Sequence, residues 1–359
     1  MTRQLKNKSN THIEHLDDTV LYNPDITIKH LNKVQQGTET STLKWDGAPS
    51  IVLGKFDHIA MVGTKSFFSK NETNYVSTEE IIAAGLSSEL SYILIVALEY
   101  AKDHINEGQL IQGDVMFCTD DKKVQNDKIQ FGLNLIKYAV PKELPEYELI
   151  KNAKIGIAFH TEYDADYNAS PIKELPESSE VLYVFDQYQC TLQDAENQSF
   201  HDNSTYCSML IDYAHKIKQF QGTTLHNLTE YHELYRKYKT MRLRYFDMVC
   251  SADHEDFEKF CFGELSEKLF NPEYKYLARQ NALQHMLEFN KVLKDTSKYF
   301  MLLSAFTFTS QQLVIHNLES TKEHNISAEH EGLVVSTDEY IIKYVDKKNF
   351  TKLNNSKRT

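Results

Sequence analysis

The sequence of 359 residues has only five cysteines, and they form no recognisable pattern. Their number is odd, and no two of them stand as a Cys-x-x-Cys pair. We therefore expect neither a disulfide framework nor a zinc site, and such free thiols are typical of proteins in a reducing cytoplasm.

Long apolar runs, repeats and a positive net charge are missing as well. No apolar run is long enough to span a membrane, and residues 1–10 are polar and basic without the core of a signal peptide. We find no internal repeat and no low-complexity linker. The net charge of −12 argues against a protein that coats DNA, although it permits a local basic groove. We therefore expect no membrane partner.

The composition is that of a globular protein with room for two domains. Hydrophobic residues make up 41% of the chain and charged residues 25%, which are ordinary values. Alternating apolar patterns predict strands at 42–44, 51–54, 59–62, 110–117, 138–140, 155–160, 331–335 and 340–345. Helical spacing predicts a helix through Ile28, Leu31 and Val34, and another over 78–106.

The sequence pattern changes between about residues 200 and 310, where apolar residues recur at helical spacing. We predict helices at 206–220, at 225–249, and from 277 towards 313. The predicted fold class is therefore α/β, more closely α+β, with antiparallel sheets flanked by helices and a helical insertion. We place the main domain at 1–199 and 316–359, and the insertion domain at 200–315.

The segment Leu43-Lys44-Trp45-Asp46-Gly47-Ala48-Pro49-Ser50 precedes the apolar run 51–53. A lysine between two apolar residues at the end of a strand is costly, because its ammonium group loses water. Asp-Gly is also a common hairpin signal, so an ordinary turn is one interpretation. Lys-x-Asp-Gly is, alternatively, a motif that presents a lysine nucleophile.

Five further short motifs follow on strand-like segments, and each has an ordinary explanation when it is taken alone. A lysine is usually at the surface, an acid often ends a strand, a phenylalanine is usually core, and Glu-Gly is usually a turn. The positions are Thr64-Lys65-Ser66, Gly113-Asp114, Phe159-His160, Glu331-Gly332 and Lys343.

Transfer of a nucleoside monophosphate to a lysine would use all of these residue types. The reaction needs a neutral lysine, carboxylates that hold a divalent metal, and cations near the reacting phosphate. It also needs a flat apolar face for the base and a group that holds the ribose. The order of the motifs resembles that of the covalent nucleotidyltransferases, the superfamily of ATP-dependent DNA and RNA ligases and mRNA-capping enzymes.

The resemblance implies a role for each matching residue. Lys44 would be the nucleophile, with Asp46 and Gly47 completing motif I. Lys65 matches motif Ia, which contacts the ribose or a phosphate. Asp114 stands where motif III normally has glutamate.

The remaining matches are to the later motifs of the superfamily. Phe159 and His160 match motif IIIa, whose aromatic residue stacks on the nucleobase. Glu331 matches the metal-binding glutamate of motif IV, and Lys343 matches the α-phosphate contact of motif V. We therefore predict that Asp114 and Glu331 share a metal site, and that ATP and Mg²⁺ or Mn²⁺ are the cofactors.

The sequence also departs from the superfamily pattern. Pro49 stands where DNA ligases usually have arginine, and Val345 takes the place of a second motif V lysine. The segment after Lys343 is too short for the OB-fold domain that follows motif V in DNA ligases and capping enzymes. The resemblance is closest to phage-type RNA ligases and to a group of tailed-phage proteins, and it covers residues 10–165 and 330–355. The host cytoplasm would then be the location.

The predicted insertion contains five cations interleaved with aromatic residues. This pattern suits either a solvated helix face or a surface that follows phosphates and stacks bases of RNA or tRNA. The cations are Arg236, Lys237, Lys239, Arg242 and Arg244.

Two histidines near the start, His12 and His15, stand among acidic residues. A metal cluster is one interpretation, and the start of a solvated helix is the one we favour.

The predicted function is ATP-dependent polynucleotide ligation, with RNA favoured over DNA, through a lysyl-AMP at Lys44 and an adenylated 5′-phosphate. Two alternatives stay open. The protein could transfer a nucleotide to another target or use GTP, or it could bind a nucleotide without turnover.

Overall fold

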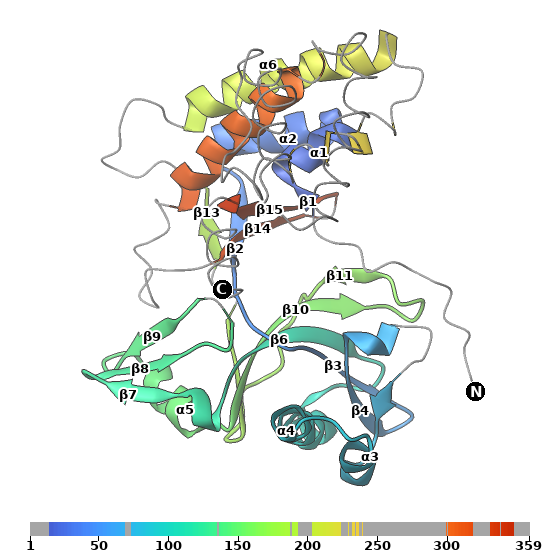
Figure 1. Ribbon diagram of the computed structural model, residues 1–359, viewed down its shortest axis with the longest axis vertical. Coiled ribbons are helices and arrows are strands. Elements are labelled where there is room, and N and C mark those ends of the chain that lie inside the picture. Colours follow the sequence, from blue (N-terminus) through green and yellow to red (C-terminus); the bar gives the residue numbers. More distant parts are fainter. Residues whose placement is uncertain are drawn as a thin grey trace, which may run out of the picture. The chain divides into compact units, whose positions relative to one another are not determined.

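The computed structural model describes residues 14–68, 73–134, 136–186, 189–192, 203–223, 229, 232–233, 235–236, 239, 299, 301–318, 331–337 and 339–347. The chain forms two compact units, each assembled from separate stretches of sequence (Figure 1). The described residues of unit 1 fall within Thr42–Gln189 and Lys322–Gly332. Those of unit 2 fall within Ile13–Ser41, Cys190–Thr321 and Leu333–Thr359.

This division differs from the predicted domains, because the first helices and the last strands belong with the helical segment. Within unit 2, α2 (Pro24–Gln35) packs against α6 (Asn203–Thr223). The Gln35 side chain donates to Ser208 Oγ at 2.8 Å, and Lys218 pairs with Asp25 at 2.6 Å. Helical periodicity predicted these helices but not which surface would cover their apolar faces.

A seven-stranded sheet forms the centre of unit 1. Its order is β11-β10-β6-β3-β4-β5, and β12 pairs with β10. The strands are β3 (Ser50–Phe56), β4 (Ile59–Thr64), β5 (Asn74–Tyr75), β6 (Leu110–Cys118), β10 (Ile155–Tyr163), β11 (Ala169–Pro171) and β12 (Leu182–Val184).

One face of this sheet is covered by α3 (Thr78–Ala83) and α4 (Ser88–His104) (Figure 1). Alternate strand residues such as Ile51, Leu53 and Ile111 are fully buried in the same core as the apolar side of α4. The sequence predicted one helix here, and the structure has two. Gly85, with φ +67°, turns the chain out of the helical region between them.

A second core of unit 1 lies under a three-stranded sheet. Its members are mostly aromatic and include Trp45, Phe117, Phe131, Tyr138 and Phe185. This sheet consists of β7 (Lys123–Gln125), β8 (Lys128–Phe131) and β9 (Tyr138–Pro141), with α5 (Glu146–Asn152) beside it. Two short 3₁₀ helices, η1 (Lys65–Phe68) and η2 (Thr119–Asp121), complete the described part of this unit.

Unit 2 combines helices with a five-stranded sheet of order β1-β15-β14-β2-β13. Its helices are α1 (Leu16–Tyr22), α2, α6 and a helix over 301–318. The strands of this sheet are β1 (Glu14–His15), β2 (Thr40–Lys44), β13 (Gln189–Thr191), β14 (Gly332–Ser336) and β15 (Ile341–Val345). The division between the units falls within three of them, so that Thr42–Lys44 of β2, Gln189 of β13 and Gly332 of β14 are counted with unit 1.

A buried histidine ties the helices of unit 2 to its sheet. His30 Nδ1 lies 2.9 Å from Glu39 Oε2, and its Nε2 lies 2.7 Å from the Tyr344 hydroxyl. Burial lowers the pKa of His30, although the hydrogen bond to Glu39 opposes that shift.

The predicted mixture of helices and largely antiparallel sheets is confirmed. Among the helices that the structure describes, none combines the length and the apolarity needed to cross a membrane.

Candidate active site around Lys44

Lys44 is the last residue of β2, and its ammonium group forms an ion pair with Glu331. The two residues are 287 positions apart in the sequence, and both belong to unit 1. The Lys44 side chain is 25% exposed and that of Glu331 is 11% exposed. The pair is therefore largely withdrawn from water, while the amine keeps some access to solvent.

The loop that follows Lys44 lies directly against β6. Ala48 N donates to Val115 O at 2.9 Å, and Val115 N donates to Pro49 O at 3.0 Å. At Gly47 a Cβ atom would lie 2.8 Å from Val115 O and 2.9 Å from Asp114 Cβ, so no larger residue fits without a shift. The chain then enters β3, where Ser50 is the register partner of Asp114. The glycine thus holds the Lys44 loop next to Asp114.

Asp46 points into the protein and shapes the loop from within. It is 3% exposed, and its carboxylate accepts hydrogen bonds from Asn134 Nδ2 at 2.5 Å and from Ile136 N at 3.0 Å. Its own backbone N–H donates to the Tyr138 hydroxyl at 2.8 Å. Its contacts are therefore those of a residue that holds the 45–49 loop in place.

Asp114 and His160 face each other across β6 and β10. The register of these strands shifts between Phe159 and Thr161, so His160 falls at an irregularity of the ladder. His160 Nε2 lies 3.7 Å from Asp114 Oδ2, and its Nδ1 lies 2.7 Å from Thr161 Oγ1. Asp114 is the register partner of Ala158, and His160 follows Ala158 by two residues, so Asp114 and His160 lie on the same face of the sheet.

Negative charge is in excess around Lys44. Burial raises the pKa of Glu331, and the nearby carboxylates of Asp46 and Asp114 add to this rise, whereas Lys44 opposes it. Burial alone would raise the pKa of Asp114 too, but His160, Ser50 and Lys44 together lower it below its ordinary value. Glu331 pairs with Lys44, and two further carboxylates, Asp46 and Asp114, lie close enough to raise the pKa of Glu331, an arrangement that suits an additional cation.

The structure places Phe159 away from this group. Its side chain is 1% exposed and belongs to the core under α4, together with Ile51 and Ile157. A nucleobase cannot stack on a ring that is already covered on both faces, so the predicted contact of Phe159 with the base is wrong. In an alternating strand the neighbouring position faces the other way, and there His160 is exposed.

The two predicted phosphate-contacting lysines, Lys65 and Lys343, belong to different units. Lys65 is exposed at the start of η1. Lys343 belongs to unit 2, in β15, where it is the register partner of His15. Within unit 1, the described contacts of Lys44 do not include Lys65.

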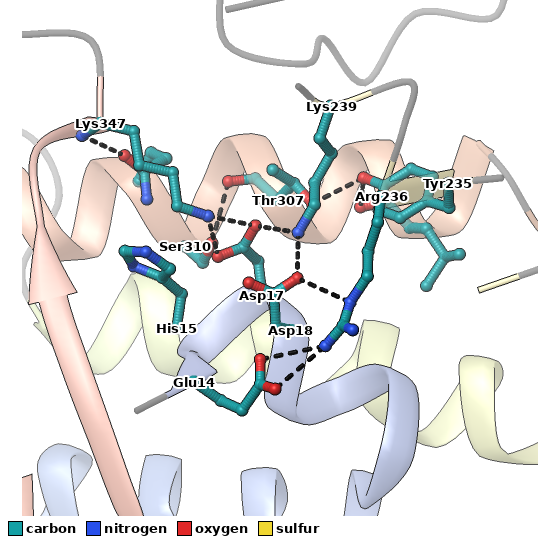
Figure 2. Close-up of polar contacts among 12 residues, drawn as sticks. Glu14, His15, Asp17, Asp18, Tyr235, Arg236, Lys239, Thr307, Ser310 and Lys347 are labelled. Atoms are coloured by element: carbon teal, nitrogen blue, oxygen red, sulfur yellow. Dashed lines mark hydrogen bonds and ion pairs between the residues drawn. The ribbon is translucent and has the colours of Figure 1, made fainter. Parts of the chain in front are cut away.

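The predicted nucleic-acid patch has a different environment from the one expected (Figure 2). Lys239 is 7% exposed and donates to Asp17 at 2.7 Å and to Asp18 at 2.6 Å. Arg236 donates to both carboxylate oxygens of Glu14 at 3.1 Å. Because these partners neutralise both cations inside unit 2, Arg236 and Lys239 are not a free phosphate-binding face. Lys237, Arg242 and Arg244 lie outside the described residues.

The acidic start of α1 is buried rather than solvated. Asp17 is 1% exposed and accepts from both Lys239 and Lys347. His15 Nδ1 is buried without a hydrogen-bond partner among the described residues, and burial, with the charge of Lys347, holds the pKa of His15 well below 6.5. His12 lies outside the described residues. The solvated helix start expected at His15 is therefore wrong.

Several residues that contribute to the site were missed in the sequence. Asn134 and Tyr138 hold Asp46 from 88 and 92 positions away, and no spacing rule connects them. Gln112, two positions before Asp114, donates to Ser50 Oγ at 2.8 Å and accepts from the Tyr163 hydroxyl. The alternation of β6 puts Gln112 and Asp114 on one face, which was the available signal.

Comparison with known proteins gives one match. The model of a family described as being of unknown function, DUF6267, matches residues 10–358. No curated protein and no solved structure matches the chain.

The buried charges of unit 2 lead to a prediction about stability. The Asp17→Asn substitution removes the carboxylate that Lys239 and Lys347 share. We expect it to lower the free energy of unfolding at pH 7 by about 3 kcal/mol. The pKa of Asp17 is lowered: burial alone would raise it, but Lys239 and Lys347 outweigh burial. Wild type therefore has this stabilisation above about pH 4, the ordinary value, and loses it progressively below.

Hydrogen exchange of backbone amides in α2 measures the effect within unit 2. The matched control is Asp25→Asn, whose partner Lys218 is exposed, and we expect a change of at most about 1 kcal/mol there. Equal losses in the two variants at pH 7, or a difference that does not shrink towards pH 3, would contradict the prediction.

Proposed function

The chain belongs to this family of unknown function, and we propose from its own site that it is an ATP-dependent polynucleotide ligase. In this proposal Lys44 accepts AMP from ATP and then passes it to the 5′-phosphate of a polynucleotide, with RNA favoured over DNA. The observation that carries the proposal is the ion pair between Lys44 and Glu331, beside Asp114 and His160.

The position of Lys44 supports a role as nucleophile. The residue ends a strand, its loop is fixed on β6, and its ammonium group has a single described partner, Glu331. A lysine held in one place has its amine positioned for attack on a phosphate bound beside it. Its 25% exposure leaves water able to accept the proton.

The proposed reaction has three transfers. The neutral Lys44 amine attacks the α-phosphorus of ATP, a P–N bond forms, the nitrogen loses a proton to solvent, and pyrophosphate leaves as its P–O bond breaks. A 5′-phosphate oxygen of the polynucleotide then attacks the same phosphorus, a P–O bond forms, and the P–N bond breaks as the nitrogen takes up a proton, which releases Lys44 as an amine. Finally a 3′-hydroxyl attacks the activated 5′-phosphate, a phosphodiester forms, its proton passes to solvent, and AMP leaves.

The residues near Lys44 fit a divalent metal. Asp114 and Glu331 offer carboxylate oxygens, and Mg²⁺ commonly uses one or two carboxylates together with substrate phosphates and water. A cation held there would supply positive charge that neutralises the triphosphate and favours the uncharged amine. By contrast, the three-residue group Glu89, Cys118 and Asp121 lies elsewhere, and the Cys118 thiol donates to Asp121.

Three further residues have proposed roles at this site. His160 is exposed beside Asp114 and takes the place that Phe159 was expected to have at the nucleotide. Lys65 and Lys343 are proposed to contact phosphates, as the motif resemblance implies.

We predict that Lys44→Arg abolishes covalent labelling by ATP. Arginine keeps the positive charge but is effectively never deprotonated, so it cannot attack phosphorus. The measurement is incubation with labelled ATP and magnesium, followed by denaturing electrophoresis, with labelled GTP in parallel.

The matched control is Lys122→Arg, which should label like wild type. Lys122 is a partly buried lysine of the same unit whose pKa is lowered by burial, and its ammonium group donates to the carbonyls of Ile150 and Lys151 at 2.9 Å. Wild-type labelling of Lys44→Arg would remove Lys44 from the mechanism. If wild type binds ATP but is never labelled, the protein binds a nucleotide without turnover. If it is labelled by GTP and not by ATP, GTP is its substrate.

We also predict that Asp114→Asn and Glu331→Gln each lower labelling at least about tenfold and raise the magnesium concentration needed for half-maximal labelling. Each change removes one negative charge that would hold the cation. Magnesium titrations of the two variants and of Asp121→Asn, a carboxylate outside the site, measure this. Magnesium curves that coincide with wild type for both site variants would count against the shared metal site.

A further inference from the structure

Two partly exposed aromatic rings of unit 1, those of Phe68 and Tyr163, pack against each other, and Tyr167 contacts Phe68 from the side. The centroids of the Phe68 and Tyr163 rings are 4.4 Å apart and the ring planes are tilted by 37°. Both rings pack on the small core of Val52, Phe67 and Leu110, which supports them from beneath. We call Phe68 and Tyr163 the aromatic platform.

The aromatic platform is joined to the candidate active site by a chain of hydrogen bonds. The Tyr163 hydroxyl donates to Gln112, and Gln112 donates to Ser50 Oγ at 2.8 Å. Ser50 is the register partner of Asp114, and Gln112 precedes Asp114 by two residues, about 7 Å along the strand. The platform therefore lies on the face of the sheet that carries Asp114, further along the strands than Gln112.

The hydrogen bond to Gln112 also fixes the Tyr163 ring. Gln112 is 6% exposed, and its amide is engaged on both sides, by Tyr163 and by Ser50. A ring with its hydroxyl anchored in this way loses little freedom when another flat group stacks on it.

A cation accompanies the rings. Lys65 is exposed and begins the same 3₁₀ turn in which Phe68 is the last residue. Aromatic rings that stack bases, next to cations that contact the backbone, are the combination with which proteins hold single strands. A nucleotide at Lys44 already has its phosphates there, so the second cation suits the phosphate of another nucleotide.

We propose that the aromatic platform stacks a nucleobase of the single-stranded polynucleotide close to the end that reacts, with Lys65 at a backbone phosphate. This inference rests on the proposed function, because the polynucleotide is the second substrate of that reaction. It moves the nucleic-acid contact from the segment 236–244 to unit 1, beside Lys44.

The test measures binding of a fluorescent, 5′-phosphorylated single-stranded RNA of twelve nucleotides in the absence of ATP. Phe68→Leu and Tyr163→Leu keep an apolar side chain but remove the flat ring, and each should weaken binding about tenfold. Tyr163→Phe keeps the ring and should bind within about twofold of wild type. The matched control is Tyr92→Leu, which removes a partly exposed tyrosine from α4 on the opposite face and should not change binding.

A salt titration tests the lysine separately, with a variant whose substitution lies at the surface. Loss of one phosphate contact lowers the slope of log K against log salt by about 0.7 for a single strand. Lys65→Gln should therefore reduce the slope by about this amount. An unchanged slope would remove Lys65 from the proposal.

Labelling with ATP, measured on the same variants, separates this proposal from the proposed function. We expect Phe68→Leu and Tyr163→Leu to label at the wild-type level, because the platform contacts the second substrate. Unchanged RNA binding in both variants would overturn the platform. So would a higher ATP requirement with unchanged RNA binding, which would assign the rings to the base of ATP. A wild type that binds RNA through the platform but is never labelled would overturn the ligase instead.

Discussion

The candidate site depends on the close approach of one loop to one strand. Residues 45–49 lie on β6 through two backbone hydrogen bonds, and the missing side chain of Gly47 makes the distance short enough. Backbone hydrogen bonds of this kind are hard to replace, because any shift would leave buried polar groups without partners. The position of Lys44 beside Asp114 follows from this contact, and Asp46 strengthens it from the inner side.

The two units use buried charges in different ways. In unit 2, the charges of Asp17 and Lys239 neutralise each other, so this buried ion pair has little net charge with which to attract another ion. Around Lys44 the carboxylates outnumber the cations, and Glu331 keeps a raised pKa although it touches the ammonium group. A balanced group mainly specifies the fold, whereas an unbalanced one leaves electrostatic energy that a ligand can use.

The sequence predicted much of the secondary structure, because strand alternation and helical spacing are local properties. It failed at Gly85, where a single left-handed residue outweighed an unbroken apolar pattern, and at Phe159, whose motif position did not determine which face of β10 it occupies. It also failed at Lys239. A basic segment looks solvated in sequence, since its acidic partner Asp17 is more than two hundred positions away. The motif order brought Lys44, Asp114 and Glu331 to attention, but Gln112 and Asn134 became visible only through their contacts.

The separation of Lys44 and Glu331 along the chain has a consequence for synthesis. A ribosome that adds roughly 5–20 residues per second needs about 15 to 60 s to reach Glu331 after it has made Lys44. During that interval the loop and β6 can already fold, but the lysine has no partner from the later segment. The nascent protein therefore carries the Lys44 amine long before the carboxylate that completes the ion pair, and the site matures only after Glu331 has been made.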